Sequence, residues 1–248
     1  MKLNDKVAVI TGGNSGIGRA SALDFQREGA KVVVFGRNQT TLDEVVAELG
    51  ENGLAVQGDV ASLADLDRLY AATAERFGKI DVLFVNAGIA PPAPLEETTE
   101  EHFDRVSDIN FKGAFFTIQK ALPHLAEGAS VIITASIAAY KGLAGMSVYA
   151  ATKAAVRSLA RTLSVELLPR GVRVNVLSPG PIETPIYDRM GLPAEAVQEF
   201  GKQVLDATPM GRWGTSEEMA KAALFLASDD SSYMAGSEII ADGGFATL

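Results

Sequence analysis

The chain contains no cysteine and only two histidines, His102 and His124, among its 248 residues. Without cysteine it can form no disulfide, thiolate metal site or cysteine nucleophile, and it needs no oxidising compartment. Neither histidine stands in a metal-ligand spacing such as H-E-x-x-H. We therefore expect no metal site and interpret both histidines as structural or exposed residues.

Runs of basic residues and long apolar runs are also missing. The formal net charge is -9, the isoelectric point is near 4.8, and lysine and arginine are not clustered. This charge disfavours nucleic acid and anionic membranes as partners and favours a small molecule. No apolar segment approaches the ~20 residues that span a bilayer, and the polar start, MKLNDK, lacks a signal-peptide pattern. We expect a cytoplasmic protein.

Short apolar segments alternate with helical segments along the whole chain. Most of the predicted strands are continuous apolar runs, which is typical of strands buried on both faces of a parallel sheet. They are residues 7–11, 31–35, 54–57, 81–85, 130–134, 172–177 and 237–240. The pattern predicts an α/β fold, a doubly wound parallel sheet of about seven strands with helices on both faces. Residues 1–248 can form it as a single domain.

Several predicted helices begin with capping-box spacing or a close match to it. The pairs are Ser62 with Asp65, Thr98 with Glu101, and Thr215 with Glu218. Helices expected around residues 113–126 and 148–168 are rich in small and apolar residues. Their faces suit packing on the sheet and equally packing on another subunit.

A glycine-rich loop follows the first predicted strand. Residues 7–10, VAVI, lead into TGGNSGIG at 11–18 and then into an amphipathic stretch at 19–28. Glycine lets the backbone approach a ligand closely, and the first N–H groups of a helix bind anions such as a pyrophosphate. The loop therefore predicts a nucleotide site, and a bare glycine turn is the structural alternative.

The residue types in this loop help to distinguish a dinucleotide site from a nucleoside-triphosphate site. Gly12, Gly16 and Gly18 do not have the G-x-G-x-x-G spacing of the general dinucleotide motif. A P-loop that hydrolyses nucleoside triphosphates needs Lys and Ser or Thr where this chain has Arg19 and Ala20. The strand and helix alternation around the loop favours a dinucleotide.

Residues that follow the other predicted strands refine this hypothesis, because ligands bind beyond the carboxyl ends of parallel strands. Arg37 follows the second strand, where an arginine accommodates the 2′-phosphate of NADP and an acidic residue selects NAD. Asp59 follows the third strand and could accept from the adenine edge, and residues 86–88 offer a tight backbone approach. Each of these residues could also serve ordinary surface or turn structure.

Tyr149 and Lys153 form a potential acid-base centre. On a helix, positions i and i+4 lie on one face about 5 to 6 Å apart, so the ammonium can lie near the phenol and favour its ionisation. Lowering a phenol pKa from ~10 to ~7 takes about 4 kcal/mol, which a single charge at ~4 Å barely supplies. A second positive charge, such as an oxidised nicotinamide ring, would help. A packed ring beside a solvated amine is the alternative.

The chain resembles the short-chain dehydrogenase/reductase family over essentially its whole length, in the form with TGxxxGIG and YxxxK motifs. The matching elements stand in the family's order. They are TGGNSGIG at 11–18, GDV at 58–60, NAG at 86–88, Asn110, Ser136, YAATK at 149–153, and PGPIET at 179–184.

The resemblance implies a Rossmann-type nicotinamide enzyme with four catalytic residues. Tyr149 would be the acid-base residue, Ser136 would hydrogen-bond the substrate oxygen, and Asn110 would hold a water in a proton relay. Lys153 would bind the nicotinamide ribose and lower the tyrosine pKa. The expected cofactor-binding residues are Gly12, Asn14, Ser15, Gly16, Ile17, Gly18, Arg37, Asn38, Asp59, Val60, Asn86, Ala87, Gly88, Tyr149, Lys153, Pro179, Gly180, Ile182 and Thr184.

The resulting hypothesis is an oxidoreductase that prefers NADP(H) over NAD(H) and acts on a small carbonyl or secondary alcohol substrate. The alternatives are a 3-oxoacyl-carrier reductase, a glucose-type sugar dehydrogenase and an NADP-sensing protein without turnover. Residues 184–213 are expected to form an apolar lid over the substrate, although the same side chains could pack on the core or on another subunit. The resemblance also implies a homotetramer or homodimer.

Overall fold

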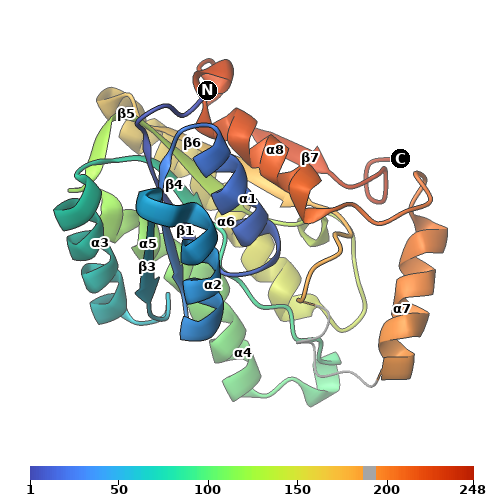
Figure 1. Cartoon of the computed structure of the whole chain (residues 1–248). Coiled ribbons are helices and arrows are strands. Elements are labelled where there is room, and N and C mark those ends of the chain that lie inside the picture. Colours follow the sequence, from blue (N-terminus) through green and yellow to red (C-terminus); the bar gives the residue numbers. More distant parts are fainter. Residues whose placement is uncertain (187–193) are drawn as a thin grey trace.

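The computed structural model describes residues 1–186 and 194–248 (Figure 1). Within these residues a seven-stranded parallel sheet forms the centre, with the strand order β3-β2-β1-β4-β5-β6-β7. The strands are β1 Val7–Thr11, β2 Lys31–Gly36, β3 Gly53–Gln57, β4 Ile80–Val85, β5 Leu125–Thr134, β6 Arg173–Pro179 and β7 Glu238–Ala241. The predicted doubly wound α/β fold is confirmed.

Helices cover both faces of this sheet (Figure 1). They are α1 Gly16–Arg27, α2 Gln39–Leu49, α3 Leu63–Phe77, α4 Glu100–Ser107, α5 Gly113–Ala121, α6 Ser147–Leu167, α7 Ala194–Ala207 and α8 Ser216–Ala227. Side chains of α1, α2 and α8 share one buried core with the sheet, and those of α3, α5 and α6 share the other.

The alternation of side chains along each strand explains why both cores are apolar. In β1, Ala8 and Ile10 enter the core with α1, α2 and α8, whereas Val9 enters the core with α3, α5 and α6. All three are fully buried. Because each fully buried Val or Ile side chain contributes about 1.5–3 kcal/mol, a strand with apolar side chains on both faces is stable only in the interior of such a sandwich.

The strand order places a crevice at the carboxyl ends of β1 and β4. From β1 the chain proceeds outward to β2 and β3, and it then returns to the other side of β1 to add β4, β5, β6 and β7. The connections after β1 and β4 therefore leave in opposite directions, which opens space between them for a ligand.

One predicted helix boundary is wrong. The helix expected over 113–126 ends at Ala121, and β5 already begins at Leu125, earlier than the expected start at 130. Leu125 pairs with Ile80, and the register shifts before the next pair, Val82 with Ser130. The irregular pairing lets β5 start in a segment whose residues do not alternate as a regular strand would.

The predicted helix caps are mostly confirmed. Ser62 accepts a hydrogen bond from the backbone N–H of Asp65, and α8 begins with a complete capping box between Thr215 and Glu218. At α4, however, the cap is Thr99, whereas the hydroxyl of Thr98 donates to a backbone carbonyl of the preceding turn. Two adjacent threonines compete for that position, and the path of the entering chain decides between them.

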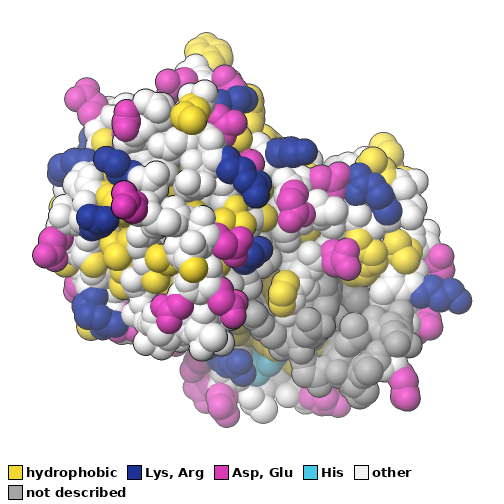
Figure 2. Space-filling model, viewed as in Figure 1, with side chains coloured by type: hydrophobic (Ala, Val, Ile, Leu, Met, Phe, Trp, Pro, Cys, Tyr) yellow, Lys and Arg dark blue, Asp and Glu magenta, His cyan; other side chains and the backbone are white. Residues whose placement is uncertain are grey.

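In the described part of the chain, no helix is long and apolar enough to cross a membrane. That part also holds no group of three or more His, Cys, Asp or Glu side chains that could bind a metal ion. Figure 2 shows acidic and basic side chains interspersed over one face of the molecule, without a broad basic patch.

Candidate active site

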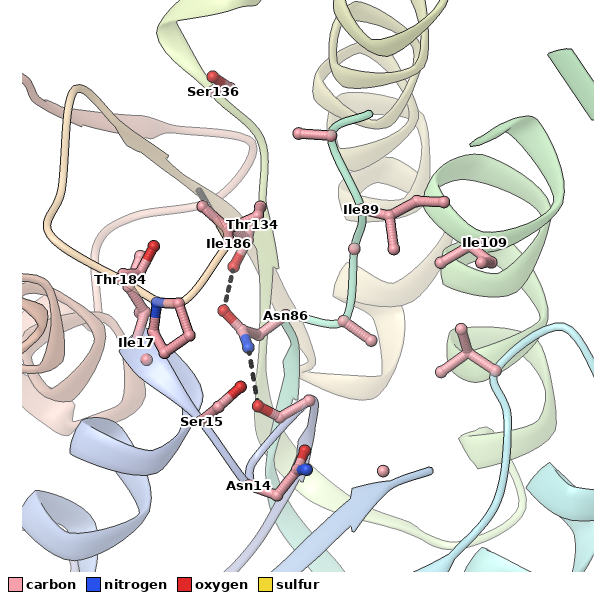
Figure 3. A pocket seen from close by; sticks show the side chains of 18 of the residues that line it. Asn14, Ser15, Ile17, Asn86, Ile89, Ile109, Thr134, Ser136, Thr184 and Ile186 are labelled. Atoms are coloured by element: carbon pink, nitrogen blue, oxygen red, sulfur yellow. Dashed lines mark hydrogen bonds between the residues drawn. The ribbon is translucent and has the colours of Figure 1, made fainter. Parts of the chain in front are cut away.

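A cavity of about 470 Å³ lies at the carboxyl ends of the strands (Figure 3). Its walls come from the glycine loop, from the segments that follow β2 to β6, and from one face of α6. The lining includes most residues predicted from the sequence. These are Gly12, Asn14, Ser15, Gly16, Ile17, Arg37, Asn38, Asp59, Val60, Asn86, Ala87, Gly88, Ser136, Tyr149, Lys153, Pro179, Gly180, Ile182 and Thr184.

The glycine loop needs glycine for two different reasons. Gly12 and Gly16 have positive φ angles, +65° and +50°, which side chains of L-residues rarely adopt. Gly18 has no such constraint, but a Cβ there would lie 2.2 Å from the carbonyl oxygen of Gly12. Gly18 does not line the cavity. Its contribution is to let α1 pack against the loop, so that the helix N-terminus points into the site.

Asn86 holds the ends of three strands together, and Figure 3 shows its hydrogen bond with Thr134. Its amide nitrogen donates to the carbonyl oxygen of Thr11 at 3.1 Å, and the hydroxyl of Thr134 donates to its amide oxygen at 3.3 Å. The Thr11 hydroxyl in turn accepts from the backbone N–H groups of Asn86 and Ala87, at 3.0 and 3.1 Å. These bonds set the relative positions of β1, β4 and β5 where the cavity opens.

Ser136, Tyr149 and Lys153 meet on one wall of the cavity. The Ser136 hydroxyl is close enough to the Tyr149 phenol to lower its pKa. The Lys153 ammonium is 5.7 Å from the centroid of the Tyr149 ring and donates to the carbonyl oxygen of Thr134 at 2.9 Å. The one-turn spacing on α6 therefore places the cation near the phenol, as the sequence predicts.

Burial dominates the electrostatics of this wall. Burial raises the pKa of the Tyr149 phenol above its ordinary value, and the hydrogen bond with Ser136 offsets only part of that rise. Burial also lowers the pKa of Lys153, to about 8. Low polarity disfavours both charged forms, so burial opposes ionisation of the phenol, and the lowering of the tyrosine pKa by Lys153 together with a second positive charge stays a prediction.

Asn110 lies behind the cavity wall and does not line it. It is 2% exposed, in the π-helical turn Asp108–Lys112 between α4 and α5. Its amide oxygen accepts from the backbone N–H of Ile89, and its amide nitrogen donates to the Ile89 carbonyl oxygen, both at 2.9 Å. The side chain therefore holds the segment after β4 in place. The sequence did not predict this contact.

Arg37 and Asp59, predicted to bind different parts of a nucleotide, lie beside one another. The guanidinium and carboxylate are 3.8 Å apart, and their side chains are 62% and 34% exposed. A smaller hollow of about 310 Å³ opens next to them, and Arg68 is among its lining residues. An exposed pair at this distance stabilises the fold by at most about 1 kcal/mol, so an anionic ligand can compete for the arginine.

Sequence reasoning missed several residues of the cavity wall. Ile89 and Ile109 form an apolar side of it (Figure 3), and Arg105 of α4 also reaches it. Arg105 is exposed and has no ion-pair partner among the described residues. Arg105 precedes Ile109 by four residues, so a regular helix would place both side chains on one face. The sequence does not predict the π-helical turn at Asp108–Lys112, which sets their actual positions.

The first part of the predicted lid also lines the cavity, through Thr184 and two following residues, Pro185 and Ile186. Before them, Ile182 forms a parallel bridge with Gly214, which ties the two ends of the segment together. The predicted lid residues Met190 and Leu192 lie outside the described residues, as does the side chain of Phe200. The structure describes α7 within the rest of the segment.

Comparisons with a family model, with related sequences and with solved structures agree with one another. Residues 12–246 match a family model described as enoyl-(acyl carrier protein) reductase. The chain belongs to the short-chain dehydrogenase/reductase family. The oxidoreductase asL5 of Sarocladium schorii is 47% identical, and the alignment covers 100% of this chain and 98% of that protein. The 3-oxoacyl-[acyl-carrier-protein] reductase FabG of Thermotoga maritima is 38% identical, over 98% of this chain and 99% of that one.

A solved short-chain dehydrogenase/reductase also superimposes closely. The crystal structure of levodione reductase has a TM-score of 0.91 and 36% sequence identity, and it covers 99% of both chains. Members of this family use NAD(P) and act on CH–OH or carbonyl groups. The protein is therefore an NAD(P)-dependent oxidoreductase with a Rossmann-type fold.

Proposed function

We propose that the protein is an NADP(H)-dependent oxidoreductase that transfers hydride between nicotinamide and a carbonyl or secondary alcohol substrate. The observation that supports this best is the meeting of Ser136, Tyr149 and Lys153 in a cavity that the glycine loop also lines. A hydroxyl donor, a phenol and an ammonium beside a phosphate-binding loop are the groups that carbonyl reduction with a bound dinucleotide requires.

The residues that line the cavity suit a dinucleotide. The pyrophosphate would lie at the start of α1, where the first turn carries no acidic residue to oppose an anion. A Cβ at Gly88 would lie 3.4 Å from the Lys153 ammonium, so glycine keeps that side of the lysine open to a ribose. We assign Ile182 and Thr184, which also line the cavity, to the nicotinamide amide.

The proton is handled by this chain's own residues. We assign Tyr149 to donate its proton to the carbonyl oxygen in reduction, while the Ser136 hydroxyl hydrogen-bonds the same oxygen. A phenol whose pKa is raised by burial keeps its proton until the carbonyl oxygen accepts it. We assign the neighbouring Lys153 ammonium to favour the phenolate that oxidation of an alcohol requires. When bound, the dinucleotide supplies or accepts the hydride. The role of Asn110 in a proton relay stays a prediction.

The charges around the cavity favour the extra phosphate of NADP(H). Arg37, Arg105 and Lys153 line it as cations and Asp59 as an anion, so the wall carries a net charge of about +2 by counting these four. The whole chain carries -9. A positive wall in an acidic protein concentrates a polyanion at this site, and Arg37 lies where the 2′-phosphate binds in related sites.

The apolar part of the cavity lining favours a neutral substrate. Ala90, Pro91 and Ile186 are apolar lining residues, which suits an aldehyde or ketone. The relative named 3-oxoacyl-[acyl-carrier-protein] reductase supports a carrier-bound 3-oxoacyl substrate as the second candidate. A glucose-type sugar dehydrogenase is a further candidate, and a non-catalytic NADP sensor is the weakest because such a sensor needs no acid-base residue.

Three further assignments stay predictions. Residues 184–213 are proposed as the substrate lid, because the first of them line the cavity. A homotetramer or homodimer follows from the family's usual assembly, and light scattering would measure it. The cytoplasm is the expected location, and fractionation of the source cells would test it.

The proposed function is tested by NADPH consumption with a panel of carbonyl compounds. Benzaldehyde, cyclohexanone, cyclohexane-1,4-dione, ethyl acetoacetate, acetoacetyl thioesters and glucono-δ-lactone cover the candidate classes. Wild type and Tyr149→Phe are compared at equal NADPH saturation. Turnover that disappears in the variant, with NADPH binding retained, supports the reductase. NADPH binding without turnover of any compound favours the sensor.

A further inference from the structure

Glu238, the first residue of the edge strand β7, accepts hydrogen bonds from three side chains of other elements. The Ser178 hydroxyl donates to one carboxylate oxygen at 2.6 Å, and the Arg157 guanidinium donates to the other at 2.6 Å. The Tyr140 hydroxyl donates to that second oxygen as well. The guanidinium also lies over the Tyr140 ring, 4.2 Å from its centroid.

Each of these donors belongs to a segment that carries part of the active site. Tyr140 closes the short turn that begins at Ser136. Arg157 is on α6, one helical turn after Lys153 and two after Tyr149. Ser178 directly precedes Pro179 and Gly180, which line the cavity.

The carboxylate itself stays outside the cavity. No residue of β7 is among the residues that line the described cavity. The Glu238 side chain is 12% exposed and that of Arg157 is 27% exposed, so their pairing is partly shielded from solvent. The hydrogen bonds with Ser178, Tyr140 and Arg157 outweigh the effect of burial and lower the pKa of Glu238. The group is therefore a charged acceptor at neutral pH, and shielded charge-assisted hydrogen bonds are stronger than exposed ones.

We propose that Glu238 is a positioning residue for hydride and proton transfer. It holds the turn that carries Ser136, the helix face that carries Tyr149 and Lys153, and the end of β6 in one geometry. This inference rests on the proposed roles of Ser136 and Tyr149, whose hydroxyls must both reach the same substrate oxygen. A displacement of ~1 Å between such groups lowers a rate by about a hundredfold, although no contact with the substrate is lost.

The test compares Glu238→Ala, Glu238→Gln and Tyr140→Phe with wild type, as the full-length protein. Asp81→Asn is the matched control, because Asp81 accepts from Lys6 and from the Val7 backbone at the opposite end of the sheet and is 22% exposed. The assay uses the panel compound that wild type reduces fastest. It records kcat, KM and the NADPH dissociation constant, together with urea unfolding to give the folded fraction.

We expect Glu238→Ala to lower kcat about tenfold to a hundredfold, with the NADPH dissociation constant within about twofold of wild type. Glu238→Gln keeps an acceptor of the same shape and should recover part of the rate. Tyr140→Phe keeps the ring beneath Arg157 and removes only the link to the Ser136 turn. Its effect should vanish in a Ser136→Ala background, because effects of residues that act as a unit are not additive.

Two results would overturn the inference. One is a kcat within about twofold of wild type for folded Glu238→Ala and Tyr140→Phe, because a positioning role predicts a loss of tenfold or more. The other is a loss that merely follows the folded fraction, as for any destabilised variant. If Tyr149→Phe retains wild-type turnover, the proposed function fails first, which separates the two failures.

A titration that needs no substrate keeps the inference testable when no panel compound is reduced. The phenolate absorbance of the NADP⁺ complex, taken as the difference from Tyr149→Phe, reports the ionisation of Tyr149. Because Glu238 sets the distance of Ser136 from the phenol, Glu238→Ala should move the midpoint by about half a pH unit or more. An unchanged midpoint would contradict the positioning role.

Discussion

Replacing Arg37 with aspartate should weaken NADPH binding far more than NADH binding. The arginine side chain is 62% exposed, and its partner Asp59 is 3.8 Å away, so the exchange removes little stability. A charge-assisted hydrogen bond to the 2′-phosphate contributes about 1.5–3 kcal/mol. The new carboxylate adds about 1 kcal/mol of repulsion at ~4 Å in water. The sum predicts NADPH binding weaker by roughly a hundredfold to a thousandfold.

The assay measures dissociation constants for NADPH and NADH by the fluorescence of the reduced nicotinamide. NADH has no 2′-phosphate, so its dissociation constant should stay within about threefold of wild type. Arg37→Gln removes the charge without adding repulsion and should fall between wild type and Arg37→Asp. Equal losses for NADPH and NADH in Arg37→Asp would refute the assignment, because they would show a general distortion of the adenosine site.

Two further predictions concern the lysine and the glycine loop. Burial lowers the pKa of Lys153 from 10.5 to about 8. Between these values the unfolded chain binds more protons, so the stability of wild type relative to Lys153→Met should rise by about 3 kcal/mol as pH increases. Urea unfolding at both ends of this window measures it, and a constant difference would contradict the burial of the charge. Gly18→Ala should weaken NADPH binding at least about tenfold, or 1.4 kcal/mol, because its Cβ meets the Gly12 carbonyl oxygen at 2.2 Å. Gly142→Ala, which enters open space, is the control, and equal NADPH binding by Gly18→Ala would show that the loop tolerates the methyl group.

Local sequence patterns predicted the parts of the site that lie on a single element. The one-turn spacing of Tyr149 and Lys153 places both on one face of α6, whatever the helix packs against. The glycine loop likewise lies between a buried strand and a helix start, so its position could be inferred from the neighbouring residues. In both cases the spacing along the chain determines the spacing in space.

Contacts between distant segments could not be predicted in the same way. The acceptor of the Lys153 ammonium is the backbone carbonyl of Thr134, and a carbonyl group has no residue-specific signal. The side chain of Asn110 forms two hydrogen bonds with the backbone of Ile89, and no pattern in the sequence predicts this contact. The raised pKa of Tyr149 depends on how many atoms of other elements exclude water from it.

The amino-acid sequence by itself determined the α/β class, the location of the glycine loop and the spacing of the candidate acid-base residues, because periodicity and short spacings are properties of one element. Only the tertiary structure decided which segments share the cavity and that Asp59 lies beside Arg37. It also decided that Glu238 links the turn at Ser136 to α6. The physical reason is that burial and long-range hydrogen bonds arise only when the sheet brings the ends of distant strands together.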